Sequence, residues 1–386
     1  MAKYRFEQIA INSTEKKKPV AKDRFTYLGL EHLDSGSLKV TRFGSEVAPI
    51  GEKLVMHKGD VLFGKRRAYQ KKVAIAPFDG IFSAHGMVLR PKEDVIDRDF
   101  FPLFISSDYF LDAAIKISVG SLSPTINWRD LKELEFELPN MDTQRKLADV
   151  LWSINDTIEA YKKLIVATDE LVKSQFLERF DIECSRKNGW TIKTLKEVVE
   201  KPLSGEWGVD DKDGTGVKVL RTANFTDAGV LDFSEVVKRK IDAKKIENKV
   251  MRMGDILIEK SGGSDSKPVG RVVLFMENSG VYLFNNFTAL IRPKNTISIL
   301  ARYLFEFLYV SYWNGSTRLY ENKTTGLHNL KLNEFLEGTE IPIPPMEIQK
   351  TFVNFLEQSD KSKFELLNAL AELTALYKRI IQDNLS

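Results

Sequence analysis

The sequence predicts an α+β protein made by duplication: two similar mixed α/β segments joined by two long antiparallel helices that form a coiled coil. Three observations predict this fold. Short motifs occur twice in the same order, β-branched and aromatic runs separated by turn residues fill each copy, and a long segment with an apolar seam follows each copy. The chain is therefore interpreted as pseudo-two-fold.

The duplicated motifs are matched pairs of short, similar stretches. They are "KGDVLFGK" (58–65) with "MGDILIEK" (253–260), "VLRPK" (88–92) with "LIRPK" (290–294), "LPNMDTQRKLADVL" (138–151) with "IPPMEIQKTFVNFL" (343–356), and weakly "YRFEQIA" (4–10) with "WTIKTLK" (190–196). Chance could supply one such match, but four in one order favour an internal repeat.

Composition sets the broad class of the protein. A chain of 386 residues with 43% hydrophobic content can fill two or three domain cores. Its formal net charge of +3 is too small for a globally basic nucleic-acid binder, so such an activity needs local clusters. The single cysteine, Cys184, excludes an internal disulfide and fits a reducing cytoplasm. With no signal-like or membrane-length apolar stretch, the expectation is a soluble, cytoplasmic protein without a membrane partner.

Each globular copy has the same expected layout. Strand-like runs cover 72–78 and 80–90 in the first copy, and 271–276 and 281–292 in the second. Helical patterns follow each "RPK", at 98–116 and 297–313. Each copy should therefore be a mixed α+β domain.

Long helices are expected over 139–185 and 343–386, because Pro and Gly are absent from 142–184 and from 346–386. Such a helix is roughly 60 Å long, more than one domain needs. Leu147, Ile154 and Tyr161 share heptad position a, Val150, Leu164 and Leu171 position d, and Leu151, Ile158, Ile165 and Val172 position e. The alternative is that each helix packs only on its own domain.

The residues expected to form the paired helices, or to face partners from them, come from both copies. They are Gln144, Leu147, Leu151, Ile154, Ile158, Tyr161, Leu164, Ile165, Gln349, Phe352, Leu356, Leu366, Leu370, Leu373 and Tyr377. In the second helix, Ser359 and Lys363 interrupt the seam. An antiparallel arrangement would return the C terminus towards the first domain.

Two basic segments lie at equivalent places in the repeat, after "GDVL" and after "GDIL". Basic side chains can bind phosphates, arginine can read guanine edges, and small polar loops admit backbone approach to phosphate. The candidate DNA-binding residues are Lys58, Lys65, Arg66, Arg67, Tyr69, Lys71, Lys72, Lys260, Ser261, Ser264, Lys267 and Arg271. A third basic stretch covers 237–252. A solvated surface is the competing interpretation of any one cluster.

The motifs of catalysis are absent from the sequence. It has no glycine-rich turn paired with an Asn/Asp-Pro-Pro-aromatic stretch, no Pro-Asp, no P-loop and no His-Glu-x-x-His. No catalytic residue and no metal site is therefore predicted. His85 and His328 each lie in a turn beside apolar strands, where a structural role is favoured over a DNA contact.

On these motifs, with "GD[IV]L" and "RPK" inside each copy and a "P-(x)-M-[DE]-x-Q" helix start after it, the whole chain resembles the specificity (S) subunits, the HsdS family, of type I restriction-modification enzymes. The resemblance implies a target recognition domain at 1–138, a central conserved helical region at 139–185, a second recognition domain at 186–342 and a C-terminal conserved helix at 343–386. The helix start matches at Pro139, Met141, Asp142 and Gln144, and at Pro344, Pro345, Met346, Glu347 and Gln349, with Asn140 in place of the second proline.

The resemblance also implies the partners. Each recognition domain would read half of a bipartite, asymmetric site in double-stranded DNA, and the helices would dock two methyltransferase (M) subunits and, through the complex, restriction (R) subunits. It implies no intrinsic catalysis and no cofactor on this chain, with S-adenosylmethionine, ATP and Mg²⁺ held by the partner subunits. Two alternatives stay open: a non-catalytic protein-binding spacer without DNA specificity, and a self-contained restriction enzyme, which the missing motifs disfavour.

Overall fold

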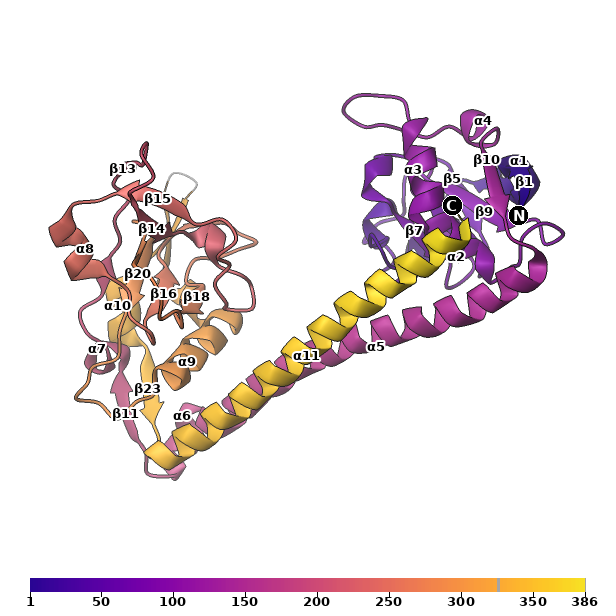
Figure 1. Cartoon of the computed structure of the whole chain (residues 1–386). Coiled ribbons are helices and arrows are strands. Elements are labelled where there is room, and N and C mark those ends of the chain that lie inside the picture. The colour runs from indigo at the N-terminus through magenta and orange to yellow at the C-terminus, as the bar shows by residue number, and fades with distance from the viewer. Residues whose placement is uncertain (325–326, 386) are drawn as a thin grey trace. The chain divides into compact units, whose positions relative to one another are not determined.

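The computed structural model describes residues 1–324 and 327–385 and divides into two compact units (Figure 1). Unit 1 comprises Met1–Lys163 with Leu366–Ser386, and unit 2 comprises Leu164–Glu365. Each unit therefore contains one globular segment and half of each long helix. None of the described helices combines the length and the apolarity that crossing a membrane requires.

Unit 1 is built on two four-stranded sheets. The first has the order β2 (Ala10–Ser13), β9 (Met87–Pro91), β6 (Val61–Phe63), β7 (Val73–Ile75), and the second has β3 (Lys16–Lys17), β5 (Lys53–Met56), β8 (Gly80–Phe82), β4 (Tyr27–Leu28). β1 (Ala2–Arg5) pairs antiparallel with β10 (Glu135–Leu138). The helices are α1 (Phe6–Ile9), α2 (Phe100–Ser106), α3 (Asp108–Lys116), α4 (Trp128–Leu131) and the first part of α5 (Met141–Phe180).

Unit 2 repeats this plan and adds a third sheet. Its sheets are β12 (Leu203–Ser204), β20 (Thr288–Ile291), β16 (Ile256–Glu259), β18 (Val272–Leu274); β13 (Val209–Asp210), β15 (Val237–Lys240), β14 (Val217–Leu220), β19 (Tyr282–Phe284); and β17 (Ser261–Gly263), β22 (Leu327–Leu330), β21 (Glu321–Thr324). β11 (Thr191–Thr194) pairs with β23 (Glu340–Ile343). The helices are α6 (Ile182–Lys187), α7 (Leu195–Val198), α8 (Ala243–Lys249), α9 (Ala301–Trp313), α10 (Leu332–Gly338) and the first part of α11 (Met346–Leu385).

The predicted duplication is confirmed by the topology. β6 lies between β9 and β7, and β16 lies between β20 and β18, so the two "GD[IV]L" motifs supply the same central strand. The weak match at the start was aligned wrongly. Phe6 N donates to Leu134 O at 2.7 Å, and Leu195 N donates to Thr339 O at 2.9 Å, so Phe6 is equivalent to Leu195. Tyr4 and Trp190, which the predicted alignment placed opposite each other, are therefore not equivalent.

A buried ion pair joins the repeated motifs in each unit. Arg90 donates to both carboxylate oxygens of Asp60 at 2.7 and 2.9 Å, and Arg292 donates to those of Asp255 at 2.6 and 2.7 Å. Asp60 is 7% exposed and Asp255 1%. These hydrogen bonds raise the pKa of both arginines. The "RPK" arginine and the "GD[IV]L" aspartate are therefore one structural element, repeated twice.

A buried glutamine fixes the start of each long helix. Gln144 Oε1 accepts from Asp97 N at 2.8 Å, and its Nε2 donates to the carbonyls of Val95 and Pro139. Gln349 makes the same three bonds, from Leu300 N and to Ser298 and Pro344. The substitution at Asn140 keeps the cap, because Asn140 Oδ1 accepts from Thr143 N at 2.9 Å.

The first long helix is shorter than predicted. α5 ends at Phe180, and Asp181 starts α6 by accepting a hydrogen bond from Cys184 N at 2.9 Å. An aspartate can therefore end one helix and cap the next without Pro or Gly. The second prediction is confirmed, since α11 is continuous from Met346 to Leu385.

Within each unit, one half of α5 packs against one half of α11, and the halves belong to opposite ends of the two helices, so the pairing is antiparallel. The seam is narrower than the predicted one, which comprised positions a, d and e: position e is confirmed and position d is wrong. Leu151 and Ile158, at heptad position e, are 0% and 9% exposed, whereas Leu164 and Leu171, at position d, are each 50% exposed. Positions a and e have the same alternating spacing as a and d, so spacing alone did not choose between them.

The seam interruption in the second helix has a partner. Lys363 donates to both carboxylate oxygens of Asp169 at 2.6 and 2.8 Å, and both residues belong to unit 2. A polar pair inside an apolar seam favours one register of the two helices over others.

Each globular core holds its helix halves through large side chains. In unit 2, Phe176 and Phe180 of α5 and Phe352 of α11 pack around Tyr303 of α9, with ring centroids 4.9–5.8 Å apart. In unit 1, Ile381 and Leu385 of α11 join the core that contains Phe6. The first and the last described segments of the chain therefore share one core, as predicted.

Candidate nucleic-acid interface

The basic loop of unit 1, residues 64–72, directly follows β6. Gly64 N donates to Lys72 O at 2.9 Å and closes the loop. Arg67 and Lys71 have φ values of 55° and 49°, the only non-glycine residues with positive φ in the described chain. Left-handed backbone is unfavourable for such residues and concentrates at functional sites. The loop therefore carries backbone strain at two positions.

A second loop, residues 118–125, supports the first. Ile126 N donates to Lys65 O and Arg67 N donates to Pro124 O, at 2.9 and 2.8 Å, and Arg66 Nε donates to Ser123 Oγ at 3.1 Å. Leu122 at its tip is 93% exposed. This loop was not predicted, because it carries no charge. Its signal in the sequence is the Gly, Ser and Pro content between residues 98–116 and β10.

The structure separates the predicted contacts of unit 1 into groups. Arg66, Arg67 and Tyr69 are exposed beside the second loop. Lys72 donates to Leu30 O at 2.6 Å. Lys58 lies before β6, at the opposite end of that strand from the loop. Arg66, Arg67 and Tyr69 are thus the exposed predicted residues of the loop itself, while the exposed Lys58 lies apart from them.

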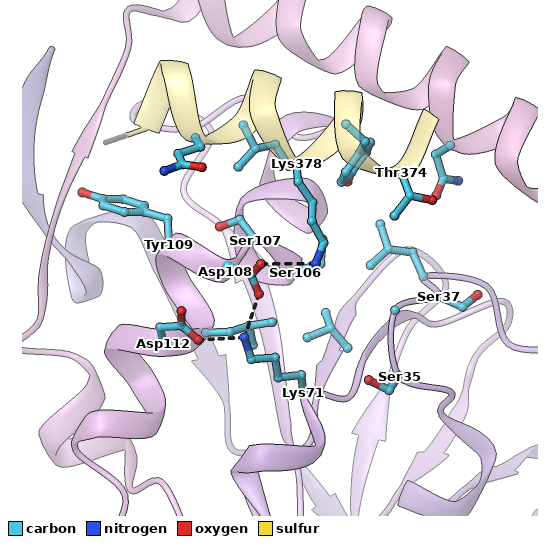
Figure 2. Close-up of a pocket in the computed structure, with 18 of the residues that line it drawn as sticks. Ser35, Ser37, Lys71, Ser106, Ser107, Asp108, Tyr109, Asp112, Thr374 and Lys378 are labelled. Carbon is cyan, nitrogen blue, oxygen red and sulfur yellow. Dashed lines mark hydrogen bonds and ion pairs between the residues drawn. The ribbon is translucent and has the colours of Figure 1, made fainter. Parts of the chain in front are cut away.

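Lys71 is held by two aspartates inside a groove of about 950 Å³ in unit 1 (Figure 2). Its ammonium lies 2.7 Å from carboxylate oxygens of both Asp108 and Asp112, and Asp108 is also 3.7 Å from Lys378 of α11. Burial opposes the lysine charge, but the two carboxylates raise the pKa of Lys71. The hydrogen bond from Lys71 lowers the pKa of Asp108. Lys71 therefore anchors the loop to α3.

The predicted Gly/Ser loop of unit 2 contains a strand. Ser261–Gly263 forms β17, which pairs with β22, and Ser261 Oγ donates to Asn329 Oδ1 at 2.7 Å. Lys260 Nζ donates to Ser204 Oγ at 2.8 Å. Ser264 and Lys267 lie in the exposed turn that follows, where Lys267 is 3.4 Å from Asp227. The second predicted surface is thus the edge of a small sheet.

Arg271 faces the interior. It donates to both carboxylate oxygens of Glu259, at 2.7 and 3.2 Å, and its side chain is 15% exposed. Despite burial, this pairing raises the pKa of Arg271. Its bonds to Glu259 and to the carbonyls of Thr222 and Phe225 use the guanidinium within the unit, so a structural role accounts for it.

Four of the seven basic residues in the third basic stretch, 237–252, pair with acids of unit 2. Arg239 pairs with Asp210, Lys240 with Asp213, and Lys245 and Lys249 with Glu206. These four side chains therefore belong to ordinary surface ion pairs.

The two histidines differ. His328 is 6% exposed and its Nδ1 lies 2.8 Å from Glu321 Oε1, which is the structural role predicted for it. His85 is exposed, and its Nε2 lies 3.3 Å from Arg66 Nη1. His85, for which a structural role was expected, thus lies on the surface beside the basic loop.

Comparison with known proteins gives a consistent result. The profile of the type I restriction modification DNA specificity domain matches residues 16–167 and 187–374. The chain is 24% identical over 214 residues to the type I restriction enzyme EcoDI specificity subunit of Escherichia coli, and 25% identical over 289 residues to the MjaIX specificity subunit of Methanocaldococcus jannaschii. These matches cover 54% and 69% of this chain, but only 44% and 63% of the relatives.

A solved structure has the same fold. Its subject is described as the structural basis underlying complex assembly and conformational transition of the type I R-M system, and it superposes with a TM-score of 0.61 at 21% identity. The superposition covers 99% of this chain and 97% of that one. With two domain matches that together span most of its length, the chain belongs to the type I restriction modification DNA specificity domain family.

Proposed function

We propose that this chain is the DNA sequence-recognition subunit of a type I restriction-modification system. In this proposal each unit reads one half of a bipartite, asymmetric site in double-stranded DNA. The observation that carries it is the duplicated framework with unequal surfaces. The Asp60–Arg90 and Asp255–Arg292 pairs are the same, while the exposed segments after β6 and β16 differ in length, charge and secondary structure.

The surface chemistry supports DNA as the ligand. Arg66 and Arg67 are exposed on a loop that is fixed by backbone hydrogen bonds and by Lys71. Arginine held in this way can make paired hydrogen bonds to guanine in the major groove. The exposed Tyr69 and Lys267 add a ring and a cation for backbone contact.

The long helices are proposed to dock partner subunits. Several apolar side chains on them lie outside the seam and are exposed: Val150, Leu164, Val166, Leu171, Leu177, Ile348, Phe364 and Leu367, from 37% to 64%. Exposed apolar residues along a helix are typical of protein interfaces. We assign this role to two methyltransferase subunits, with restriction subunits joining through the complex.

Catalysis is proposed to lie in those partners. The chain would serve as a non-catalytic specificity subunit in the cytoplasm, and S-adenosylmethionine, ATP and Mg²⁺ would be bound by the methyltransferase and restriction subunits. Incubating the purified chain with plasmid and these three compounds should give neither cutting nor methylation. Either reaction would contradict this assignment.

The proposal is tested by mapping methylated sites in cells that co-express the chain with its methyltransferase. A bipartite motif is expected, and Arg66→Ala or Arg67→Ala should relax one half of it alone, at a cost of about 1–3 kcal/mol per base-reading arginine. If methylation needs no defined sequence, or binding to random duplex shows no salt dependence, a protein-binding spacer is the better description.

A further inference from the structure

Lys65 and Lys260 occupy the same place in the two units. Lys65 O accepts from Ile126 N at 2.9 Å, and Lys260 O accepts from Leu330 N at 2.8 Å. The next residues are equivalent too, since Arg66 N donates to His85 O and Ser261 N donates to Phe287 O, each at 3.2 Å. Each lysine is the third residue after its "GD[IV]L" motif, and beyond the lysines the two sequences diverge.

Both ammonium groups lack a counter-ion within the described part of the chain. Lys65 makes no hydrogen bond or ion pair through Nζ to a described residue, and Lys260 Nζ bonds only the neutral Ser204 hydroxyl at 2.8 Å. Burial lowers the pKa of both, and a second lysine adds repulsion, Lys16 near Lys65 and Lys249 near Lys260. Nearby Lys71, by contrast, has two aspartates.

A half-buried ammonium group without a nearby anion is desolvated and has no compensating ion pair. Desolvation disfavours its charge, and a bound anion would restore it by forming charge-assisted hydrogen bonds. An uncompensated lysine occurs at the same framework position in both units, which points to an anionic ligand group that both units bind. On duplex DNA the group that recurs independently of sequence is the backbone phosphate.

The positions beside each lysine differ in chemistry. In unit 1 they are Arg66 and His85, whose side chains lie 3.3 Å apart and offer hydrogen bonds to base edges. In unit 2 they are Ser261 and Phe287, and the phenyl ring is 45% exposed. An exposed ring makes apolar contacts, for which the thymine methyl group is the partner in the major groove.

We propose that Lys65 and Lys260 hold equivalent DNA phosphates in the two half-sites, and that the adjacent pairs, Arg66 with His85 and Ser261 with Phe287, read different bases. This inference rests on the proposed DNA-recognition function and assigns separate roles to residues of that surface. The shared lysine supplies affinity, and the unequal neighbours supply specificity.

The phosphate assignment is tested with K65Q, K260Q and the double variant. Affinity is measured over a range of salt concentrations for two duplexes: a preferred site selected from a random pool, and random sequence. Each single variant should lower affinity for both duplexes by the same factor and reduce the slope of log affinity against log salt by about 0.9, and the double variant should reduce it by about twice that. K65R and K260R should retain the slope.

The charge-matched control is K187Q, on the exposed last turn of α6, which should leave the slope unchanged. Circular dichroism melting confirms that each variant is folded. A normal slope in K65Q and K260Q, or a loss confined to the selected site, overturns the phosphate assignment. A flat slope in the unaltered protein would instead overturn the proposed function.

The base-reading part is tested by H85F and F287H, which give each unit the side chain of the other. Selection from a random pool should show altered base preference in one half of the site for each variant, with an unchanged salt slope. Identical preferred sites for both variants and the unaltered protein would refute the role of these two positions.

Discussion

At the scale of single residues, the repeated motifs are structural. The "GD[IV]L" aspartate and the "RPK" arginine form one buried ion pair per unit, and the helix-start glutamine makes three buried hydrogen bonds. Gly59 and Gly254, just before the aspartates, have φ values of 93° and 91°, which only glycine adopts without strain. These residues recur because they build the frame, and the residues proposed to contact DNA lie beside them.

The buried pairs give a stability prediction. Asp255→Asn should cost unit 2 about 3 kcal/mol or more, because it leaves the Arg292 guanidinium, 16% exposed, without its carboxylate. Asp60→Asn should cost less, because Arg90 is 34% exposed and better solvated. The free energy of urea unfolding, monitored by hydrogen exchange, would measure the cost of each substitution. The exposed Asp94→Asn is the control, and equal stability of all three variants would contradict the assigned role.

At the scale of elements, α9 packs on the long-helix halves of unit 2 and carries a buried acid. Glu306 is 3% exposed, with Arg302 Nη2 3.9 Å away, and that same atom lies 2.8 Å from Asp360 of α11. Burial raises the pKa of Glu306 to about 7, which Arg302 and Lys173 oppose and Asp360 and Asp169 favour. This acid is therefore mostly protonated in the folded unit at pH values below about 7.

The pH dependence follows from that shift. An unfolded glutamate titrates near 4.3, so the folded unit binds the extra proton between that value and about 7. The stabilisation is complete below the lower value and is lost as pH rises through the upper one, on the order of 3 kcal/mol in all. Glu306→Gln should remove this loss, measured as the free energy of unfolding at pH 5 and pH 8. An unchanged pH profile in Glu306→Gln would refute the assignment.

The exposed apolar residues of α5 predict how partners dock. Leu164→Asp with Leu171→Asp should weaken capture of the methyltransferase subunit at least about tenfold, since each leucine side chain contributes about 1.5–3 kcal/mol when buried. Both are 50% exposed, so the chain itself should remain folded. Lys163→Asp is the control, because it adds a carboxylate at an exposed site without removing an apolar side chain. Undiminished co-purification would place the docking face elsewhere.

The sequence predicted where helices and strands occur better than which side of a helix is buried. The strands within the predicted runs, α9 and α11 follow from periodicity and turn residues, which are local signals. The runs 80–90 and 281–292 each contain two strands of different sheets, and the helix predicted over 98–116 is two helices, α2 and α3. Leu164 was predicted to face the seam and is exposed, because heptad spacing does not state which apolar stripe finds a partner. The end of α5 at Phe180 was missed because a capping aspartate is also an ordinary surface residue.

The predicted interface was limited in the same way. Lys65, Arg66 and Arg67 could be selected from charge and from the repeat. Lys71 and Arg271 belong to intramolecular ion pairs whose acids lie 37 and 12 residues away, and no sequence pattern announces such pairs. The loop at 118–125 carries no charge and was invisible to a search for basic residues. Pairings across the fold therefore decide which cations are free.

At the scale of the whole molecule, unit 1 is discontinuous, because it needs Leu366–Ser386 to complete it, whereas unit 2 is one unbroken stretch. A chain that ends at Glu365 should therefore lose unit 1 selectively. Ile381 and Leu385, 7% and 1% exposed, would leave its core, at a cost of more than about 3 kcal/mol. Hydrogen exchange should rise in β6 and α2 and stay low in β16 and α9. Equal loss of protection in both units would contradict this division.

This discontinuity also sets an order of events during synthesis on the ribosome. Every residue of unit 2 is translated before the segment 366–386 that closes unit 1, although unit 1 also contains the earliest residues, 1–163. The nascent chain must carry an unfinished first domain, with part of its core uncovered, for the time needed to make roughly two hundred further residues. A premature stop before codon 366 would thus damage the domain that was begun first.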